Sequence, residues 1–344
     1  MTAAPARLVP DLLDEYGKTA RVELASYTRV RQPFRHLYKL VADYPERGGR
    51  MLRPSICLAT AGAMCGNRSV AIGPAIAIEL LHNAFLVHDD IEDESELRRG
   101  VQTLHELHGI PLAVNTGDAL CLLALQALSD HRVELGWSLT RLLEADFRRA
   151  AFESVEGQAI ELGWRRDNAV HLTIQDYLEM TLKKTCWYST IFPLRAGAMA
   201  ATRKPLGPSD LVELGFLLGA AFQIQDDLLN LVGDEERYGK ERDGDLYEGK
   251  RTLIVIHLLQ NAGAADRAEL VNLLALPREK KTAADVAWIR ARMDEHRSIE
   301  YARAVAHSLA GAALYECRKT FGHLDSSIDR DFLEQLCAWV LQRS

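Results

Sequence analysis

The sequence is poor in the features that mark secreted and nucleic-acid-binding proteins. Its 344 residues carry a formal charge of −7, with no basic stripe interleaved with aromatic residues, which excludes a nucleic-acid surface. Cysteines are few, and their spacing matches neither a disulfide framework nor a metal-binding pair, so we expect reduced core residues and a cytoplasmic protein. The six are Cys57, Cys65, Cys121, Cys186, Cys317 and Cys337.

Long hydrophobic runs are also missing. No uninterrupted apolar stretch reaches the ~20 residues that a membrane-spanning helix needs, so we expect no transmembrane segment. The N-terminal stretch MTAAPARLVPDLLDEYGK has no apolar core of signal-peptide length and carries acidic residues early. Any association with a membrane would therefore have to come through a hydrophobic substrate or product.

Alternating, β-branched runs bounded by turn residues are scarce. Apolar residues instead recur at helical spacing through most of the chain, interrupted only by short Gly- and Pro-containing breaks such as 48–49, 109–111 and 204–208. The 48% hydrophobic content is ample for a large core, and no repeat or flexible linker divides the chain. The sequence predicts one all-α domain spanning residues 1–344.

The stretch from 79 to 100, ELLHNAFLVHDDIEDESELRRG, is an apolar helix that ends in a cluster of acidic residues. On a helix, Asp89 and Asp93 project from one face, with Asp90 and Glu92 on either side. Carboxylates this close repel one another unless a cation compensates them, and a hard divalent ion such as Mg²⁺ suits their oxygens. For this cluster alone, a solvated helix end is the more ordinary interpretation.

A second apolar helix repeats the arrangement at 219–231, GAAFQIQDDLLNL. Asp226 and Asp227 form its acidic pair, with Gln223 one turn before and Asn230 one turn after. Two such helices facing each other would make one acidic cleft, which argues against two unrelated solvated ends.

Basic residues accompany both acidic clusters and a glycine turn near the N-terminus. Carboxylates that hold Mg²⁺ within a ring of arginine and lysine are typical of a diphosphate site. The glycines of the turn YPERGGRMLRP let the backbone approach a ligand closely. The basic residues concerned are Arg50, Arg53, Arg98, Arg99, Lys240 and Lys250.

Taken together, these motifs resemble those of the trans (all-E) isoprenyl diphosphate synthases. The family's DDxxD motif followed by RRG matches residues 89–100, and its FQxxDDxxD motif matches the segment from 222 to 230. GGRMLRP at 48–54 resembles GGKxxRP, and 239–252 resembles the GK...DL..GK.T run. The chain departs from the pattern at Arg50, where lysine is usual, and at Asn230, where the second motif normally ends in aspartate.

The resemblance implies a helical bundle around a central cavity, usually as a homodimer. It implies Mg²⁺-dependent condensation of isopentenyl diphosphate with an allylic diphosphate (dimethylallyl, geranyl or farnesyl), with three ions in each site. The product would be a linear all-trans prenyl diphosphate, with C20 geranylgeranyl diphosphate expected before C15 farnesyl diphosphate.

The resemblance also assigns roles to individual residues. Arg50, Arg53, His82 and Arg99 would hold isopentenyl diphosphate, whereas Arg98, Lys184, Lys240 and Lys250 would serve the allylic diphosphate. Thr185 and Gln223 would face the developing cation. Metal ligands would be Asp89, Asp93, Asp226, Asp227 and Asn230, with Asp90 as a further catalytic acid. Leu81, Ala84 and Phe85 would line the path of the growing chain and limit its length.

Three other functions share parts of this pattern. A class I terpene cyclase also ionises an allylic diphosphate, and a head-to-head condensing enzyme joins two of them, but neither needs the acceptor residues Arg50, Arg53 and Arg99. A noncatalytic subunit that regulates a synthase is the third alternative, which the substitution at Asn230 leaves open.

Overall fold

The computed structural model describes residues 8–233 and 242–342, and within these ranges it consists of helices and one short hairpin. The hairpin pairs β1 (Leu97–Arg98) with β2 (Val101–Gln102) in antiparallel register. Its two-residue turn has positive φ at Arg99 (55°) and Gly100 (75°), the backbone signature of a tight hairpin turn that matches strand twist. The predicted all-α fold class is confirmed.

The helices follow one another with short connections. In chain order they are α1 (Leu8–Tyr27), η1 (Phe34–Tyr38), α2 (Lys39–Glu46), α3 (Leu52–Cys65), η2 (Arg68–Ala71), α4 (Ile72–Glu92), α5 (Leu104–His108), α6 (Ile110–Asp130), α7 (Arg132–Leu135), α8 (Trp137–Arg166), α9 (Ile174–Thr181), η3 (Leu182–Ile191), α10 (Phe192–Thr202), α11 (Val212–Val232), α13 (Gly244–Glu248), α14 (Leu253–Asn261), α15 (Ala264–Ala275), η4 (Arg278–Lys280), α16 (Ala283–Glu295), α17 (Ser298–Phe321) and α18 (Ile328–Trp339).

Local sequence explains where several helices begin and end. Thr173 starts α9 with a reciprocal capping box, and Thr282 does the same for α16, so that first-turn amides without helical partners are satisfied. Gly66 ends α3 in the left-handed conformation that glycine adopts without steric cost. Pro193 lies at the start of α10, which continues directly from η3, where the π-helical pattern gives way to the α-helical one.

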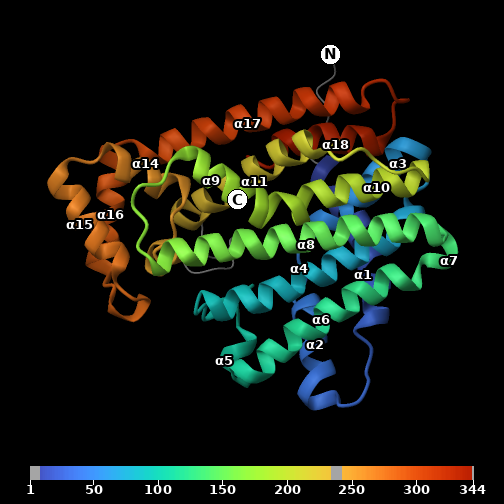
Figure 1. Cartoon of the computed structure of the whole chain (residues 1–344), viewed down its shortest axis with the longest axis horizontal. Coiled ribbons are helices and arrows are strands. Elements are labelled where there is room, and N and C mark those ends of the chain that lie inside the picture. Colours follow the sequence, from blue (N-terminus) through green and yellow to red (C-terminus); the bar gives the residue numbers. More distant parts are fainter. Residues whose placement is uncertain (1–7, 234–241, 343–344) are drawn as a thin grey trace.

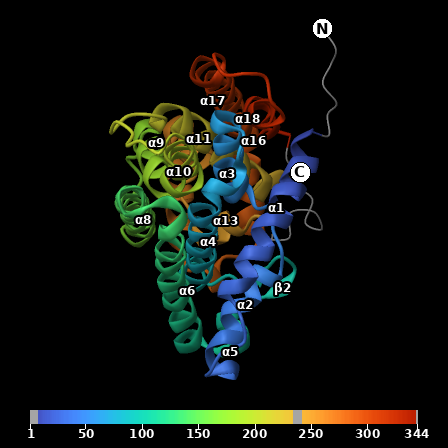
Figure 2. The same cartoon turned by 90° about the vertical axis from the view of Figure 1, so that its right-hand side faces the viewer.

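The long helices run side by side along the molecule, and α14, α15 and α16 gather at one end (Figure 1). α4 packs against α3 and α6, α8 packs against η3, and α11 packs against η3 and α17. The turned view shows α8 and α6 together along one edge, with α1 and α2 on the other side of α4 (Figure 2). α4, α8, η3 and α11 thereby surround the interior at the level of the aspartate clusters.

Although the sequence has no long uninterrupted apolar run, two helical segments are apolar over most of their length. Arg68–Glu92 and Ile110–Leu135 are each long and apolar enough to cross a bilayer, and 72% and 44% of their most apolar windows are buried. A helix of this composition is equally typical of the interior of a helical bundle. α4 is such a core helix, whereas α6 keeps part of its apolar surface exposed.

Candidate active site

A large cavity of about 870 Å³ lies among α4, α8, η3 and α11. It brings together most of the residues selected from sequence, although they come from segments more than 200 positions apart. Those that line it are Arg50, Arg53, His82, Phe85, Asp89, Arg98, Arg99, Lys184, Thr185, Gln223, Asp226, Asp227 and Lys250. Lys240 lies outside the described residues.

Asp89 faces the cavity from the last turn of α4, opposite Lys184 on η3. The Lys184 ammonium lies 3.7 Å from Asp89 Oδ1 and donates a short hydrogen bond to Glu161 of α8. Burial would lower the pKa of Lys184, but Glu161 and Asp89 outweigh it and raise this pKa above the ordinary lysine value. Gly157 makes the arrangement possible, because a Cβ there would lie 2.1 Å from the Lys184 backbone nitrogen. A charged lysine is thus held beside the first aspartate motif.

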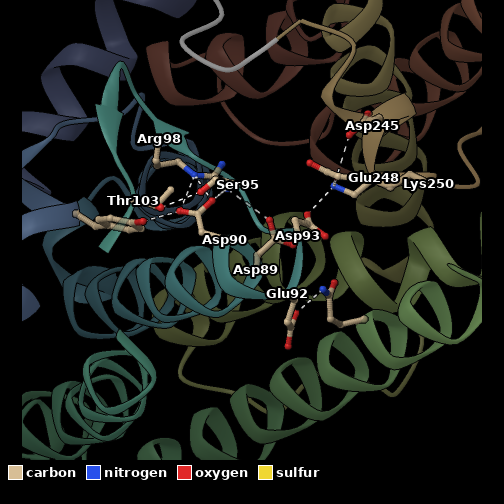
Figure 3. A network of polar contacts seen from close by, with 12 residues as sticks. Asp89, Asp90, Glu92, Asp93, Ser95, Arg98, Thr103, Asp245, Glu248 and Lys250 are labelled. Atoms are coloured by element: carbon tan, nitrogen blue, oxygen red, sulfur yellow. Dashed lines mark hydrogen bonds and ion pairs between the residues drawn. The ribbon is translucent and has the colours of Figure 1, made fainter. Parts of the chain in front are cut away.

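Asp93 is almost fully buried and is held by two cations. Arg165 Nη1 lies 2.5 Å from Asp93 Oδ1, and Lys250 Nζ lies 2.7 Å from Oδ2. Burial alone would raise the pKa of Asp93, but Lys250, Lys184 and Arg165 together hold it below the usual aspartate range. Figure 3 shows Asp93 pointing toward Lys250, which also pairs with Glu248 at 2.7 Å. Asp93 is therefore ionised and adjoins the cavity through Lys250.

Asp90 has a different environment from its neighbours and corrects part of the prediction. It is fully buried, forms a short ion pair with Arg98, and accepts a 2.5 Å hydrogen bond from the Tyr44 hydroxyl (Figure 3). The carboxylate therefore points away from the cavity and anchors β1 to α4, which does not fit the catalytic role expected of it. Arg98 lines the cavity, but its Nε and Nη2 are committed to Asp90.

On α11, Asp227 of the second aspartate pair belongs to a chain of hydrogen bonds. Thr185 Oγ1 donates to Gln223 Oε1, and Gln223 Nε2 donates to Asp227 Oδ1, each at 2.8 Å. Tyr177 donates to the other oxygen of Asp227 at 2.8 Å. Burial and the charge of Asp245 raise the pKa of Asp227 above the ordinary aspartate value. Asp227 thus orients Gln223 directly and Thr185 through Gln223, the two residues that we expect to face the developing cation.

Asn230, which ends the second motif, does not line the cavity. Its side chain is buried, and Oδ1 accepts a 3.0 Å hydrogen bond from the backbone amide of Asp245 at the start of α13. The amide thus satisfies a helix terminus, so we withdraw Asn230 from the expected metal ligands. Among the described residues, no three carboxylate, imidazole or thiol groups are gathered closely enough to enclose a metal alone. Mg²⁺ commonly uses one or two carboxylates together with substrate phosphates, which Asp89, Asp226 and Asp227 can provide.

All four of the expected acceptor residues line the cavity. Arg53 Nη2 donates to Tyr188 Oη and Ser189 Oγ, both at 2.9 Å. Arg99 Nη1 donates to the Tyr44 carbonyl at 3.0 Å, and the Arg50 guanidinium lies over the Trp339 ring at 5.4 Å. His82 completes the set from α4.

Of the three residues expected to line the path of the growing chain, only one lines the cavity. Phe85 lines the cavity and packs edge-on against Tyr188, with ring centroids 5.4 Å apart. Leu81 and Ala84 are buried in the core and are not among the lining residues, which corrects their expected role. The reason is helical geometry. Phe85 precedes Asp89 by four residues, close to one full turn, so the two side chains lie on the same face of α4. Ala84 and Leu81 precede Asp89 by five and eight residues, so their side chains point in other directions.

Several site residues carried no recognisable signal in the sequence. Glu79 lies buried beneath the arginines, where burial raises its pKa although Arg53 and Arg99 oppose the shift. Arg165 and Tyr188 match no motif, and only their partners in space identify them. Helical spacing could have found one of the missed residues, Leu86, which stands three positions before Asp89 and also lines the cavity.

Comparison with known sequences agrees with this geometry. The family model described as "Polyprenyl synthetase" matches residues 34–293, more than half of the chain. A short chain isoprenyl diphosphate synthase of Methanothermobacter thermautotrophicus is 34% identical over 86% of this chain and 87% of its own length. A geranylgeranyl pyrophosphate synthase of Geoglobus acetivorans is 31% identical over 98% and 99%.

Solved structures show the same arrangement of helices. The geranylgeranyl pyrophosphate synthetase of Pyrococcus horikoshii superposes with a TM-score of 0.84 at 30% identity, covering 97% of this chain and 99% of that one. A polyprenyl synthase of Caulobacter crescentus, complexed with calcium and isoprenyl diphosphate, gives 0.84 at 25% identity over the full length of both chains.

Proposed function

Since the chain belongs to the polyprenyl synthetase family, we propose that it joins isopentenyl diphosphate head to tail with an allylic diphosphate. The product is a linear all-trans prenyl diphosphate of C20 length, the activity named for its Geoglobus acetivorans relative. One observation supports the proposal: a single cavity is lined both by aspartates from α4 and α11 and by the arginines Arg50, Arg53, Arg98 and Arg99.

The aspartate-lined part of the cavity suits the allylic diphosphate. Asp89, Asp226 and Asp227 offer the hard oxygen ligands that Mg²⁺ prefers. Asp93 is not among the residues that line the cavity, and its two oxygens are paired with Arg165 and Lys250. Bound Mg²⁺, which we expect as three ions, supplies Lewis-acid stabilisation of the negative charge that develops on the departing diphosphate. Lys184 places its own positive charge at the same point, where it favours ionisation of the allylic carbon–oxygen bond.

At its other end, the cavity suits the acceptor. Arg50, Arg53, His82 and Arg99 offer a position for the diphosphate of isopentenyl diphosphate, and the planar guanidinium of arginine can donate to two phosphate oxygens at once. Held there, the acceptor double bond attacks the allylic cation, while Thr185 and Gln223 turn polar oxygens toward the charge. Loss of a proton to the released diphosphate then restores the alkene. Positioning of the two substrates supplies much of the rate in this scheme.

A homodimer in the cytoplasm fits the remaining surface and thiol chemistry. All six cysteines are free, as the reducing cytoplasm keeps them. α6 and α8, which lie on one face of the molecule (Figure 2), expose large apolar side chains at helical spacing. The exposed residues are Val114, Leu122, Leu125, Phe152 and Val155. We propose that a second copy of the chain covers this face.

Incubation of the purified protein with Mg²⁺, isopentenyl diphosphate and one allylic diphosphate at a time tests the function directly. Dephosphorylated products are identified by chromatography and mass, and the proposal expects linear C20 alcohol. C15 alcohol alone would move the assignment to a farnesyl diphosphate synthase. Cyclic hydrocarbon formed without isopentenyl diphosphate would indicate a cyclase, and complete absence of turnover would indicate a noncatalytic subunit.

A further inference from the structure

Tyr188 lies where the acceptor end of the cavity meets its apolar wall. It comes from η3, a segment with the wider π-helical hydrogen-bond pattern, which often occurs at functional sites. Lys184 and Thr185 from the same segment also line the cavity. No motif of the sequence includes Tyr188, so its contacts alone indicate what it does.

The hydroxyl of Tyr188 orients Arg53. Arg53 Nη2 donates to this hydroxyl and to Ser189 Oγ, both at 2.9 Å, and its guanidinium carbon lies 4.5 Å from the centre of the Tyr188 ring. One edge of the guanidinium is therefore fixed by protein. Nε, on another edge, is buried and makes no hydrogen bond with any described residue. A guanidinium held in this way presents its remaining donors to an anion in a defined plane.

The ring of Tyr188 has a second neighbour, the length-controlling residue Phe85. The two rings meet edge to face with centroids 5.4 Å apart and planes at 83°, and both line the cavity. His82 stands one turn before Phe85 on α4, and the centroid of its ring lies 6.0 Å from the centroid of the Tyr188 ring. Tyr188 thus contacts the acceptor-binding side chains and the apolar wall at once.

We propose that Tyr188 is a positioning residue that orients Arg53 through its hydroxyl and helps to limit product length through its ring. The proposal rests on the function proposed above, because it assigns Arg53 to the acceptor diphosphate. The two roles belong to different parts of the Tyr188 side chain. The hydroxyl contributes to acceptor binding, whereas the ring packs against Phe85.

Two substitutions test the two roles separately. Tyr188→Phe removes only the hydroxyl, so we expect the Kd and KM for isopentenyl diphosphate to rise about tenfold, with kcat and product length unchanged. Tyr188→Leu also removes the ring, so we expect the same weakening together with longer products. Tyr315→Phe and Tyr315→Leu are matched controls, because Tyr315 lies on α17 with 69% of its surface exposed. Circular dichroism and thermal unfolding establish that each variant is folded.

A double-variant cycle shows whether the hydroxyl acts through Arg53. In an Arg53→Gln background, Tyr188→Phe should weaken binding no further. Unchanged Kd and KM in Tyr188→Phe would overturn the hydroxyl role, and wild-type product length in a folded Tyr188→Leu would overturn the ring role. Direct binding of isopentenyl diphosphate is measured without turnover. Failure of the wild-type protein to condense substrates would therefore count against the proposed function and leave the binding test of Tyr188 intact.

Discussion

At the scale of residues, we propose different roles for three side chains on one face of α4. Asp89, Phe85 and His82 all line the cavity from this helix, and we propose that they serve the allylic diphosphate, the prenyl chain and the acceptor, respectively. Their spacing of three and four residues keeps all of them on that face. Substitution of each residue should therefore affect a different measurable step.

Asp89 is the residue whose loss should most clearly affect metal-dependent ionisation. We expect Asp89→Ala to lower kcat at least about a hundredfold and to change its dependence on Mg²⁺ concentration, because a ligand is lost where negative charge develops. Rates are measured over a Mg²⁺ titration. Asp118→Ala removes an aspartate with a 65% exposed side chain and serves as the control. An unchanged Mg²⁺ profile in Asp89→Ala would exclude the residue as a ligand.

Phe85 and Leu81 should differ sharply when each is shortened to alanine. Phe85→Ala opens the cavity wall, so we expect longer prenyl products at a largely retained rate. Leu81→Ala leaves a void in the core, which should lower the free energy of unfolding by about 2–5 kcal/mol without lengthening the product. Product masses and urea unfolding curves distinguish the two. Products of equal length from wild type and Phe85→Ala would remove Phe85 from length control.

At the scale of elements, close packing of helices aligns η3, which contributes Lys184, Thr185 and Tyr188 to the cavity. Gly157 allows α8 to approach η3 at Lys184, and Thr190 of η3 donates to the Gly215 carbonyl of α11 at 2.6 Å. η3 is thereby held between two long helices and presents Lys184 and Thr185 to the cavity. Neither contact follows from the local sequence of η3.

The contact between α14 and α17 should weaken in mild acid. His257 on α14 lies 2.9 Å from Ser298 Oγ and stacks on Tyr301, with ring centroids 4.1 Å apart. Burial and the nearby His296 lower the pKa of His257. As the pH falls below about 6.5, His257 is therefore protonated in the unfolded chain before it is protonated in the folded protein. The contribution of His257 to the free energy of unfolding is present above that pH and lost below it.

Urea unfolding at pH 7.5 and pH 5.5 measures this effect. The wild type should lose more stability between the two values than His257→Gln, which has no titrating ring at this place. His323→Gln, at an exposed position, is the control for removing a histidine. Equal losses in the wild type and in His257→Gln would contradict the assignment.

At the scale of the whole molecule, the exposed apolar face of α6 and α8 should determine the oligomeric state. Leu122 is 68% exposed on this face, so we expect Leu122→Glu to convert a dimer into monomers by placing a charge in a desolvated interface. Val22→Glu on α1, at a 78% exposed apolar position, is the matched control and should remain dimeric. Sedimentation velocity gives the masses. A wild type that sediments as a monomer, or a dimeric Leu122→Glu, would exclude this face as the interface.

The sequence predicted the whole-molecule architecture better than the partners of individual residues. Helical periodicity was enough to place Asp89 and Phe85 on the cavity side of α4. It could not indicate that Asp90 is buried against Tyr44, because that partner lies 46 positions away. Nor could the substitution at Asn230 reveal that its amide binds the backbone of Asp245. Such roles depend on tertiary packing, which a single sequence does not display.

Arg99 in the hairpin turn has a backbone conformation that lowers stability and a side chain that we propose for binding isopentenyl diphosphate. A residue with a side chain is disfavoured at positive φ by roughly 1 kcal/mol, and asparagine followed by glycine suits such a turn far better. Arg99 nevertheless stands there with φ of 55° and lines the acceptor end of the cavity. Arg99→Asn should therefore raise the urea midpoint while it weakens the binding of isopentenyl diphosphate. A lowered midpoint would mean that the hydrogen bond from Arg99 to the Tyr44 carbonyl outweighs the strain. A raised midpoint would instead mean that the protein tolerates a less stable hairpin in return for a guanidinium that lines its cavity.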